Sequence, residues 1–288
     1  GTVNVAGIYW ALGNLEYEVD GDTDTGFAAG WRIAPTQYHF FYMPQVVDGT
    51  PDAEGHNKTI TEYTKVAHFN FGGIPFGEEI NPFSTSHKSA LHIAGPTGED
   101  SAFDFSGKMF TDATCTTPAG SWADAKYGDI AYWASKGQYR MPTAAEFEKL
   151  YTDACYTFAT YNDGTNTIYG SYFYNPAKGQ LAGKVEGTKV LIADDLETGL
   201  FLPWSGRAYN NTDYNIYNIT KQGYYRTSTV DSNSKVEQDY GVIYRVNDFT
   251  ILNNTGTKSV TDIDGTKKTT YNFGATSRYA IRPVYIAE

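Results

Sequence analysis

The sequence predicts an α+β fold built from antiparallel sheets, two main helices and long loop insertions. Short apolar runs with alternating side chains recur from one end of the chain to the other, as half-buried strands require. Two segments, 122–136 and 143–154, place apolar side chains at helical intervals. The 288 residues include 24 Tyr and 29 Gly, and stretches rich in Gly, Pro and Asn separate the periodic runs, which is typical of loop-rich β proteins.

Composition and charge argue against two classes of partner. The formal net charge is -11, and charged residues make up 19% of the chain. A nucleic-acid-binding protein needs clustered Lys and Arg, and the sequence has no such cluster. No apolar run approaches the roughly 20 residues of a membrane-spanning helix. We therefore expect neither a nucleic-acid partner nor a transmembrane helix.

The first 26 residues predict a hairpin followed by an acidic turn. Val3–Tyr17 reads as extended chain, and Gly13-Asn14 is a turn signal within it. Asp20, Asp22 and Asp24 then alternate next to glycines, a pattern that can wrap a calcium ion. The spacing does not match an EF-hand loop, since Trp31 stands where the bidentate Glu belongs. A solvated acidic turn is the alternative to this possible structural calcium site.

The centre of the chain predicts two helices around a short strand. Trp122–Lys136 has helical periodicity, and Gly137 suits the residue just after a helix end. Gln138–Met141 reads as a strand that stops at Pro142. Thr143 and Glu146 have the spacing of a capping box, which begins a second helix. Four further residues are expected to bury one face of that helix: Phe147, Leu150, Tyr151 and Ala154.

The last third predicts strands separated by one polar run. Leu200–Gly206 reads as a buried strand, whereas the Asn- and Tyr-rich stretch Arg207–Gln222 favours a surface loop. Strands are also expected at Gly223–Thr229 and at Tyr240–Val246. Tyr279–Ile286 is expected to be the final strand, and its proline, Pro283, predicts an edge or a bulge.

Several of these motifs together resemble a known family. RMPTAAEFEKL (140–150), LFLPWSG (200–206), GYYRTST (223–229) and SRYAIRPV (277–284) are similar to motifs of the Bacteroidetes/Fibrobacter major paralogous domain proteins. These belong to the C-type-lectin-like group that includes the formylglycine-generating, sulfatase-modifying enzymes. The resemblance implies a C-type-lectin-like fold, in which Arg140, Pro142, Thr143, Glu146 and Phe147 are scaffold residues.

The same comparison argues against catalysis. Both cysteines, Cys115 and Cys155, precede the C-terminal region where the formylglycine-generating enzymes carry their cysteine pair. The H-x-x-x-H-x-E helix of related iron enzymes and the sugar-binding calcium motifs of C-type lectins are absent from the sequence. We expect no catalytic residue and no cofactor apart from the possible calcium. The two cysteines form either one disulfide or two buried thiols.

These observations predict a non-catalytic cell-surface recognition module that binds a glycan or a protein in adhesion. Aromatic side chains in loops can stack on sugar faces or form protein hot spots. The alternatives are a structural surface or pilus-tip component and, less favoured, a divergent enzyme. The alternative for the loop itself is that its tyrosines pack against one another. The predicted ligand-binding residues are Trp204, Tyr209, Asn211, Tyr214 and Tyr217.

The resemblance also predicts organisation and location. We expect a single domain over residues 1–288, in which a strand-rich extension of about 1–100 packs on a 101–288 core. Proteins of this group are similar to exported lipoproteins. We therefore expect the chain at the cell surface, attached to the outer membrane or secreted, with an export signal or lipid anchor upstream of Gly1.

Overall fold

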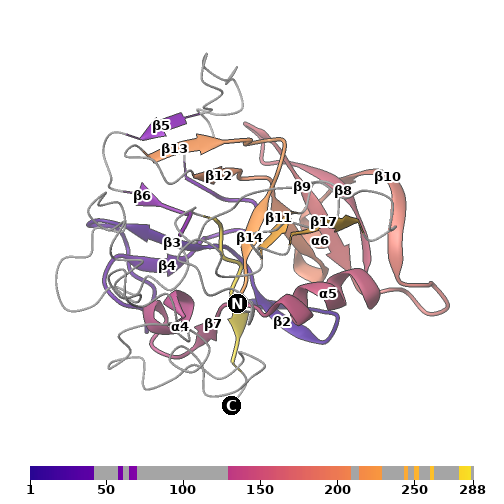
Figure 1. The fold of residues 1–288 in the computed structure, drawn as a ribbon, viewed down its shortest axis with the longest axis horizontal. Helices are drawn as coiled ribbons and strands as arrows, with labels where there is room; N and C mark the ends of the chain where they lie inside the picture. Colours follow the sequence, from indigo (N-terminus) through magenta and orange to yellow (C-terminus); the bar gives the residue numbers. More distant parts are fainter. Residues whose placement is uncertain are drawn as a thin grey trace.

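The computed structural model describes residues 1–41, 58–60, 65–69, 129–208, 214–228, 243–245, 250–252, 260–262 and 279–286. Within these ranges the fold is α+β and consists mostly of sheet, with a few short helices (Figure 1). The coarse prediction is therefore confirmed, and the C-type-lectin-like topology stays a prediction. Predicted features outside the described residues include Tyr209, Asn211, Cys115 and the first part of the first helix, 122–128.

One sheet joins the two ends of the chain. Its strand order is β1-β2-β18-β7, and all three pairings are antiparallel. Because β18 lies between β2 and β7, the edge alternative of the edge-or-bulge prediction for the last strand is wrong. Pro283 directly precedes that strand, and its carbonyl oxygen accepts the Ala11 N–H at 2.8 Å. The strands are β1 (Thr2–Val5), β2 (Ile8–Ala11), β7 (Tyr139–Arg140) and β18 (Val284–Tyr285).

The N-terminal hairpin exists, but its turn lies earlier than predicted. Strands β1 and β2 are joined at Ala6 and Gly7, whose φ angles are 55° and 75°. Gly13-Asn14 instead passes the chain from β2 to a second sheet, so the predicted turn position is wrong. That sheet has the order β4-β3-β6, with β3 (Leu15–Glu18), β4 (Trp31–Ile33) and β6 (Lys65–Val66).

Two of the helices flank β7 as predicted. Helix α4 (Ile130–Ala134) precedes it and α5 (Ala144–Thr152) follows. The end of α4 is a Schellman motif, since the N–H of Gly137 bonds to Tyr132 O and that of Lys136 to Trp133 O. The left-handed position after the cap is therefore held by Lys136 (φ 51°), one residue before the predicted Gly137.

The largest described sheet follows α5 and has the order β10-β8-β9-β11. Its first three strands are eight or nine residues long. Strand β10 pairs with β8 in parallel, so the sheet is mixed and the prediction of purely antiparallel sheets is wrong here. In Figure 1, β10 runs along the outer edge of the molecule. The elements are β8 (Cys155–Asn162), β9 (Thr167–Tyr174), β10 (Gly183–Leu191), α6 (Ala193–Thr198) and β11 (Leu200–Pro203).

Two small antiparallel sheets complete the described fold. One has the order β12-β13-β5 and the other β14-β15-β16-β17. Because β12 and β13 lie inside 207–222, the prediction of a loop throughout that stretch is wrong. Ile216 and Ile219 are buried there, which explains why part of the polar run is a strand. The strands are β5 (Lys58–Ile60), β12 (Arg207–Ala208), β13 (Tyr214–Tyr217), β14 (Tyr224–Arg226), β15 (Ile243–Arg245), β16 (Thr250–Leu252) and β17 (Val260–Asp262).

Buried apolar side chains form two clusters, one against each face of the β10-β8-β9-β11 sheet. One cluster includes Tyr172 and Phe201, and the other includes Phe173 and Leu200. These neighbours in sequence point to opposite faces because side chains alternate along a strand. The sheet is thus buried on both sides over part of its length, which gives any exposed remainder a rigid support.

Candidate functional site

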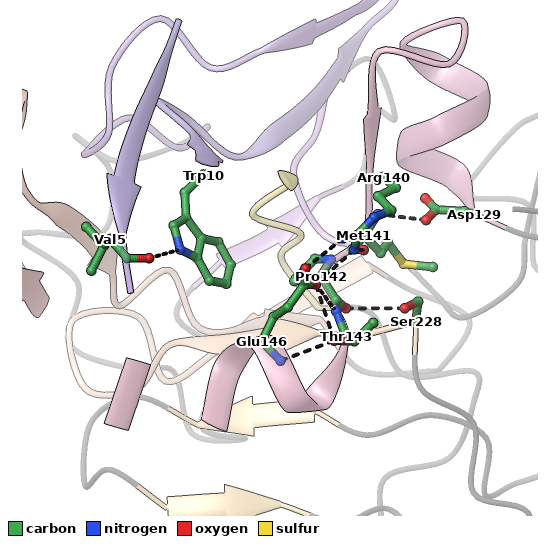
Figure 2. Close-up of polar contacts among 9 residues, drawn as sticks. All are labelled: Val5, Trp10, Asp129, Arg140, Met141, Pro142, Thr143, Glu146 and Ser228. Atoms are coloured by element: carbon green, nitrogen blue, oxygen red, sulfur yellow. Dashed lines mark hydrogen bonds and ion pairs between the residues drawn. The ribbon is translucent and has the colours of Figure 1, made fainter. Parts of the chain in front are cut away.

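The predicted corner at 140–147 is a scaffold (Figure 2). Arg140 forms a bidentate ion pair with Glu146, with distances of 2.6 Å and 2.8 Å from its two terminal nitrogens to Oε1 and Oε2. Thr143 Oγ1 accepts the Glu146 N–H at 3.1 Å, and Glu146 Oε2 accepts the Thr143 N–H at 2.8 Å. Both halves of the predicted capping box are therefore present.

Asp129 ties the same corner to helix α4. Its Oδ1 accepts the N–H groups of Ala131 and Tyr132, and its Oδ2 accepts the Met141 N–H at 2.7 Å. Burial raises the pKa of Asp129 to about 6, against the lowering effect of these N–H groups and of Arg140. Sequence reasoning missed this residue, although an Asp just before a helix is a capping signal.

The corner also contacts two distant segments of the chain. Pro142 O accepts the Ser228 N–H at 2.8 Å, and Phe147 packs edge-on against Trp10 at a centroid distance of 5.2 Å. Phe147 and Trp10 are fully buried. We conclude that Arg140, Thr143 and Glu146 fix the corner itself, while Met141, Pro142 and Phe147 join it to other segments of the chain.

Trp204, one of the predicted ligand-binding residues, leads to a different surface. It continues β11 by one residue, and its N–H bonds to Tyr169 O at 2.8 Å. Its indole Nε1 donates to Ser171 Oγ at 3.1 Å, and its ring meets Phe158 edge-on at 5.6 Å. All three contacts lie on β8 and β9, so the side chain of Trp204 sits on one face of the β10-β8-β9-β11 sheet. We call this the outer face.

Helix α6 covers the opposite face. Tyr172 Oη donates to Asp195 O at 2.9 Å, and Lys189 Nζ pairs with Asp195 Oδ1 at 2.6 Å. The same Lys189 ammonium lies over the rings of Tyr172 and Tyr174. The side chain of Lys189 therefore points away from the outer face. It lies on the side of α6, where Asp195 and the two tyrosine rings contact it.

The strand registers place four outer-face residues in one line across the sheet. Val190 pairs with Thr160, Thr160 pairs with Tyr169, and Trp204 is bonded to Tyr169. We call Val190, Thr160, Tyr169 and Trp204 the cross-strand row. Val190 is 72% exposed and Tyr169 is 42% exposed, while Thr160 and Trp204 are half-buried. Solvent thus reaches all four strands along this line.

The two aromatic rings of the row lie nearly parallel. The centroids of Tyr169 and Trp204 are 6.4 Å apart, with 19° between the ring planes. Phe158 and the bond to Ser171 hold the indole in place from the buried side. The result is a preorganised, stacked aromatic pair at the border between the core and solvent, with Tyr169 as its more exposed member.

Only part of the predicted Asn/Tyr surface can be placed. Thr220 N–H bonds to Trp204 O at 2.9 Å, so the turn after β13 lies against the end of β11. Tyr217 is half-buried and pairs with Arg207, and Tyr214 pairs with Ile60. The structure thus brings Trp204 close to the end of the strand that carries Tyr214 and Tyr217. Tyr209 and Asn211 lie outside the described residues.

Sequence reasoning missed three members of the row: Thr160, Tyr169 and Val190. Their alternation with buried neighbours, as in Ile168 and Gly170 on either side of Tyr169, is a usable signal for exposed positions. Which strands lie next to each other was the missing information, because the parallel β10–β8 pairing has no local sequence signature.

The possible calcium loop is exposed. Asp20, Asp22 and Asp24 face solvent, and Asp24 Oδ2 accepts the Ile33 N–H at 3.0 Å. Among the described residues, no three His, Cys, Asp or Glu side chains are grouped as metal ligands. The hydrogen bond that Asp24 accepts from β4 gives one of the three acids a structural role, and the calcium site stays a prediction.

Two further predictions concern the cysteines and membrane-spanning helices, and the structure addresses each of them in part. Cys155 is a buried free thiol whose Sγ lies 3.4 Å from Leu181 O. Of the helices in the described ranges, none has the length and apolar content to cross a membrane.

Comparisons with known proteins identify no relative of this chain. No protein-family model, no curated protein and no solved structure matches this chain.

Proposed function

We propose that the chain is a non-catalytic recognition module displayed at the cell surface, which binds a glycan in adhesion through the cross-strand row. The observation that carries the proposal is the Tyr169–Trp204 pair, whose near-parallel rings stand at an exposed part of a sheet that is buried on both sides over part of its length. Sugar rings have one face made largely of C–H groups, and such a face stacks on aromatic rings. The rigid sheet supports the pair before any ligand arrives, which lowers the entropic cost of binding.

The outer face offers little for catalysis. The residues of the row are Val, Thr, Tyr and Trp, and none is a carboxylic acid, a histidine or a cysteine. General acid–base or nucleophilic chemistry requires groups of those kinds within reach of a substrate. This composition supports a binding role for the surface in preference to the divergent-enzyme alternative.

A glycan array with the purified protein tests the proposal. We expect a group of glycans to bind, and Tyr169→Ala and Trp204→Ala to reduce that binding by about 10-fold or more. Tyr9→Ala is the matched control, because Tyr9 is another half-exposed tyrosine on a strand, in the sheet of β1 and β2. Equal loss in the control would mean that the row has no special part in binding.

A protein partner is the second candidate, and one observation favours it. Strand β10 is the last described strand on its side of the sheet, and Leu181, Val190 and Ile192 near it are all exposed. Exposed apolar side chains of this kind are found at protein interfaces. Two results together would favour a protein partner over a glycan. They are no binding across a broad glycan array and a stable protein complex recovered from the native cell surface.

A further inference from the structure

This inference rests on the proposed glycan site. The charge distribution of the outer face indicates whether the glycan bound there is charged or neutral. The row lies between two others: Thr188, Phe158, Ser171 and Leu202 on one side, and Asn162 and Thr167 on the other. None of these side chains, and none in the row, carries a charge. Such a neutral area contrasts with a chain whose formal net charge is -11.

The two lysines of β10 do not alter this picture. Lys184 pairs with Tyr156, at the opposite end of the strand, and its ammonium lies 3.3 Å from Glu186. Lys189 faces α6 and pairs with Asp195. A carboxylated or sulfated sugar on the row would therefore meet no cation, and the net negative charge of the protein would repel it.

The row is longer than one sugar ring, and its two halves carry different side chains. Adjacent strands lie about 4.8 Å apart, so the three steps from Val190 to Trp204 span roughly 14 Å. This exceeds one pyranose ring. The rings of Tyr169 and Trp204 occupy one half of the row. The hydroxyl of Thr160 and the apolar side chain of Val190 occupy the other half.

From these features we infer that the ligand is an uncharged oligosaccharide of at least two sugar units. It lies across the strands, with one unit on Tyr169 and Trp204 and the next towards Val190. Thr160 and Thr188 supply neutral hydroxyls that can exchange hydrogen bonds with sugar hydroxyls. Because the row has no carboxylate to hold a metal ion, binding is expected to proceed without calcium.

The test compares matched glycans on the purified protein. The probes are a neutral oligosaccharide identified on the array, its single-sugar unit, and a carboxylated or sulfated form of the same chain, each in calcium and in EDTA. We expect the neutral chain to bind at least about 10-fold more tightly than the single unit or the acidic form. EDTA should change its Kd by less than about 2-fold.

A substitution in the middle of the row supplies a gain-of-function readout. Thr160→Lys places an ammonium between Val190 and Tyr169, and we expect it to shift the preference about 10-fold towards the acidic chain. Val19→Lys is the control, since Val19 is an exposed valine just after β3 and adds the same charge elsewhere. A circular dichroism melt of each variant confirms that it is folded.

The outcomes separate this inference from the proposed function. Preference for acidic glycans, loss of binding in EDTA, or equal binding of the single unit would overturn the uncharged-oligosaccharide inference while leaving a glycan-binding module. Equal shifts in Thr160→Lys and Val19→Lys would also overturn it, because the effect would then come from net charge. Absence of any glycan binding by the wild-type protein would remove both.

Discussion

Arg282 Nε donates a hydrogen bond of 2.8 Å to Asn14 Oδ1, and the two residues lie 268 positions apart in the chain. The same guanidinium donates to three backbone carbonyls, those of Ala11, Leu12 and Gln37. It is fully buried, and burial lowers its pKa to about 10, so it remains charged at neutral pH. One buried cation therefore joins the last strand region to the end of β2, to the segment between β2 and β3, and to Gln37 after β4.

Asn14→Ala is predicted to destabilise the protein by about 2 kcal/mol, because it leaves one donor of a buried guanidinium unpaired. Urea unfolding measures this loss. Asn175→Ala is the control, since Asn175 also bridges distant segments, to Ala6 N and Asn4 O, but does so at the surface. The control should cost clearly less, and an equal cost would show that burial of the Arg282 cluster adds nothing.

Local signals predicted the scaffold better than they predicted the strand pairing. The Thr143–Glu146 cap was predictable because each partner is three residues from the other, and the burial of Phe147 follows from helical spacing. The turn at Ala6-Gly7 was not predictable, because Gly13-Asn14 carries the stronger turn signal. Which of the two sites forms the hairpin turn depends on where β18 pairs. Non-local pairing decided that case against local propensity.

Thr143→Ala tests the separation of scaffold from site. Removing the hydroxyl deletes the acceptor for the Glu146 N–H, and we expect a loss of roughly 1 kcal/mol in the free energy of unfolding. Glycan affinity, measured in the same preparation, should stay at the wild-type value because the row lies on β8 to β11. Abolished binding in a folded Thr143→Ala protein would show that the corner belongs to the site.

The ion pair of Glu146 predicts a pH dependence. Burial alone would raise the pKa of this carboxyl, but Arg140 and Thr143 lower it below the ordinary value of 4.5. A carboxyl whose pKa is lowered in the folded state stabilises the protein above its unfolded-state pKa and loses that contribution as pH falls. Glu146→Gln should therefore cost about 2 kcal/mol at neutral pH and progressively less below pH 4.5.

The measurement is the difference in unfolding free energy between wild type and Glu146→Gln from pH 7 down to about pH 3. Taking the difference cancels the contributions of other acids, Asp129 included. Glu148→Gln serves as control, since Glu148 is exposed on the same helix. A wild-type minus Glu146→Gln difference that stays constant with pH would mean that the Arg140–Glu146 pair does not depend on the charge of Glu146.

The candidate site was predictable only at Trp204. An aromatic residue at the end of an apolar run stands out in a sequence, whereas Thr160 and Val190 are ordinary strand residues that gain meaning from their place beside Tyr169. The predicted tyrosines of 209–217 were selected by composition, and their part in binding stays a prediction; burial of Ile216 shows only why the polar composition did not reveal strand β13. Register, which no local pattern specifies, is what assembles the row.

Gly206→Ala tests the link between Trp204 and the strand that follows. Gly206 has a φ of 71°, and a Cβ at this position would lie 2.1 Å from Tyr217 O and 3.0 Å from the backbone nitrogen of Ile219. We expect a loss of about 3 kcal/mol from strain and displacement of β13, and weaker glycan binding because the end of β11 moves with it. Gly179→Ala measures the backbone-strain part alone, since Gly179 has a φ of 87° and nothing within 4 Å of the added carbon. That control should cost about 1 kcal/mol and leave binding unchanged. Equal costs for the two variants would mean that backbone strain alone accounts for the loss and that β13 does not press on Gly206.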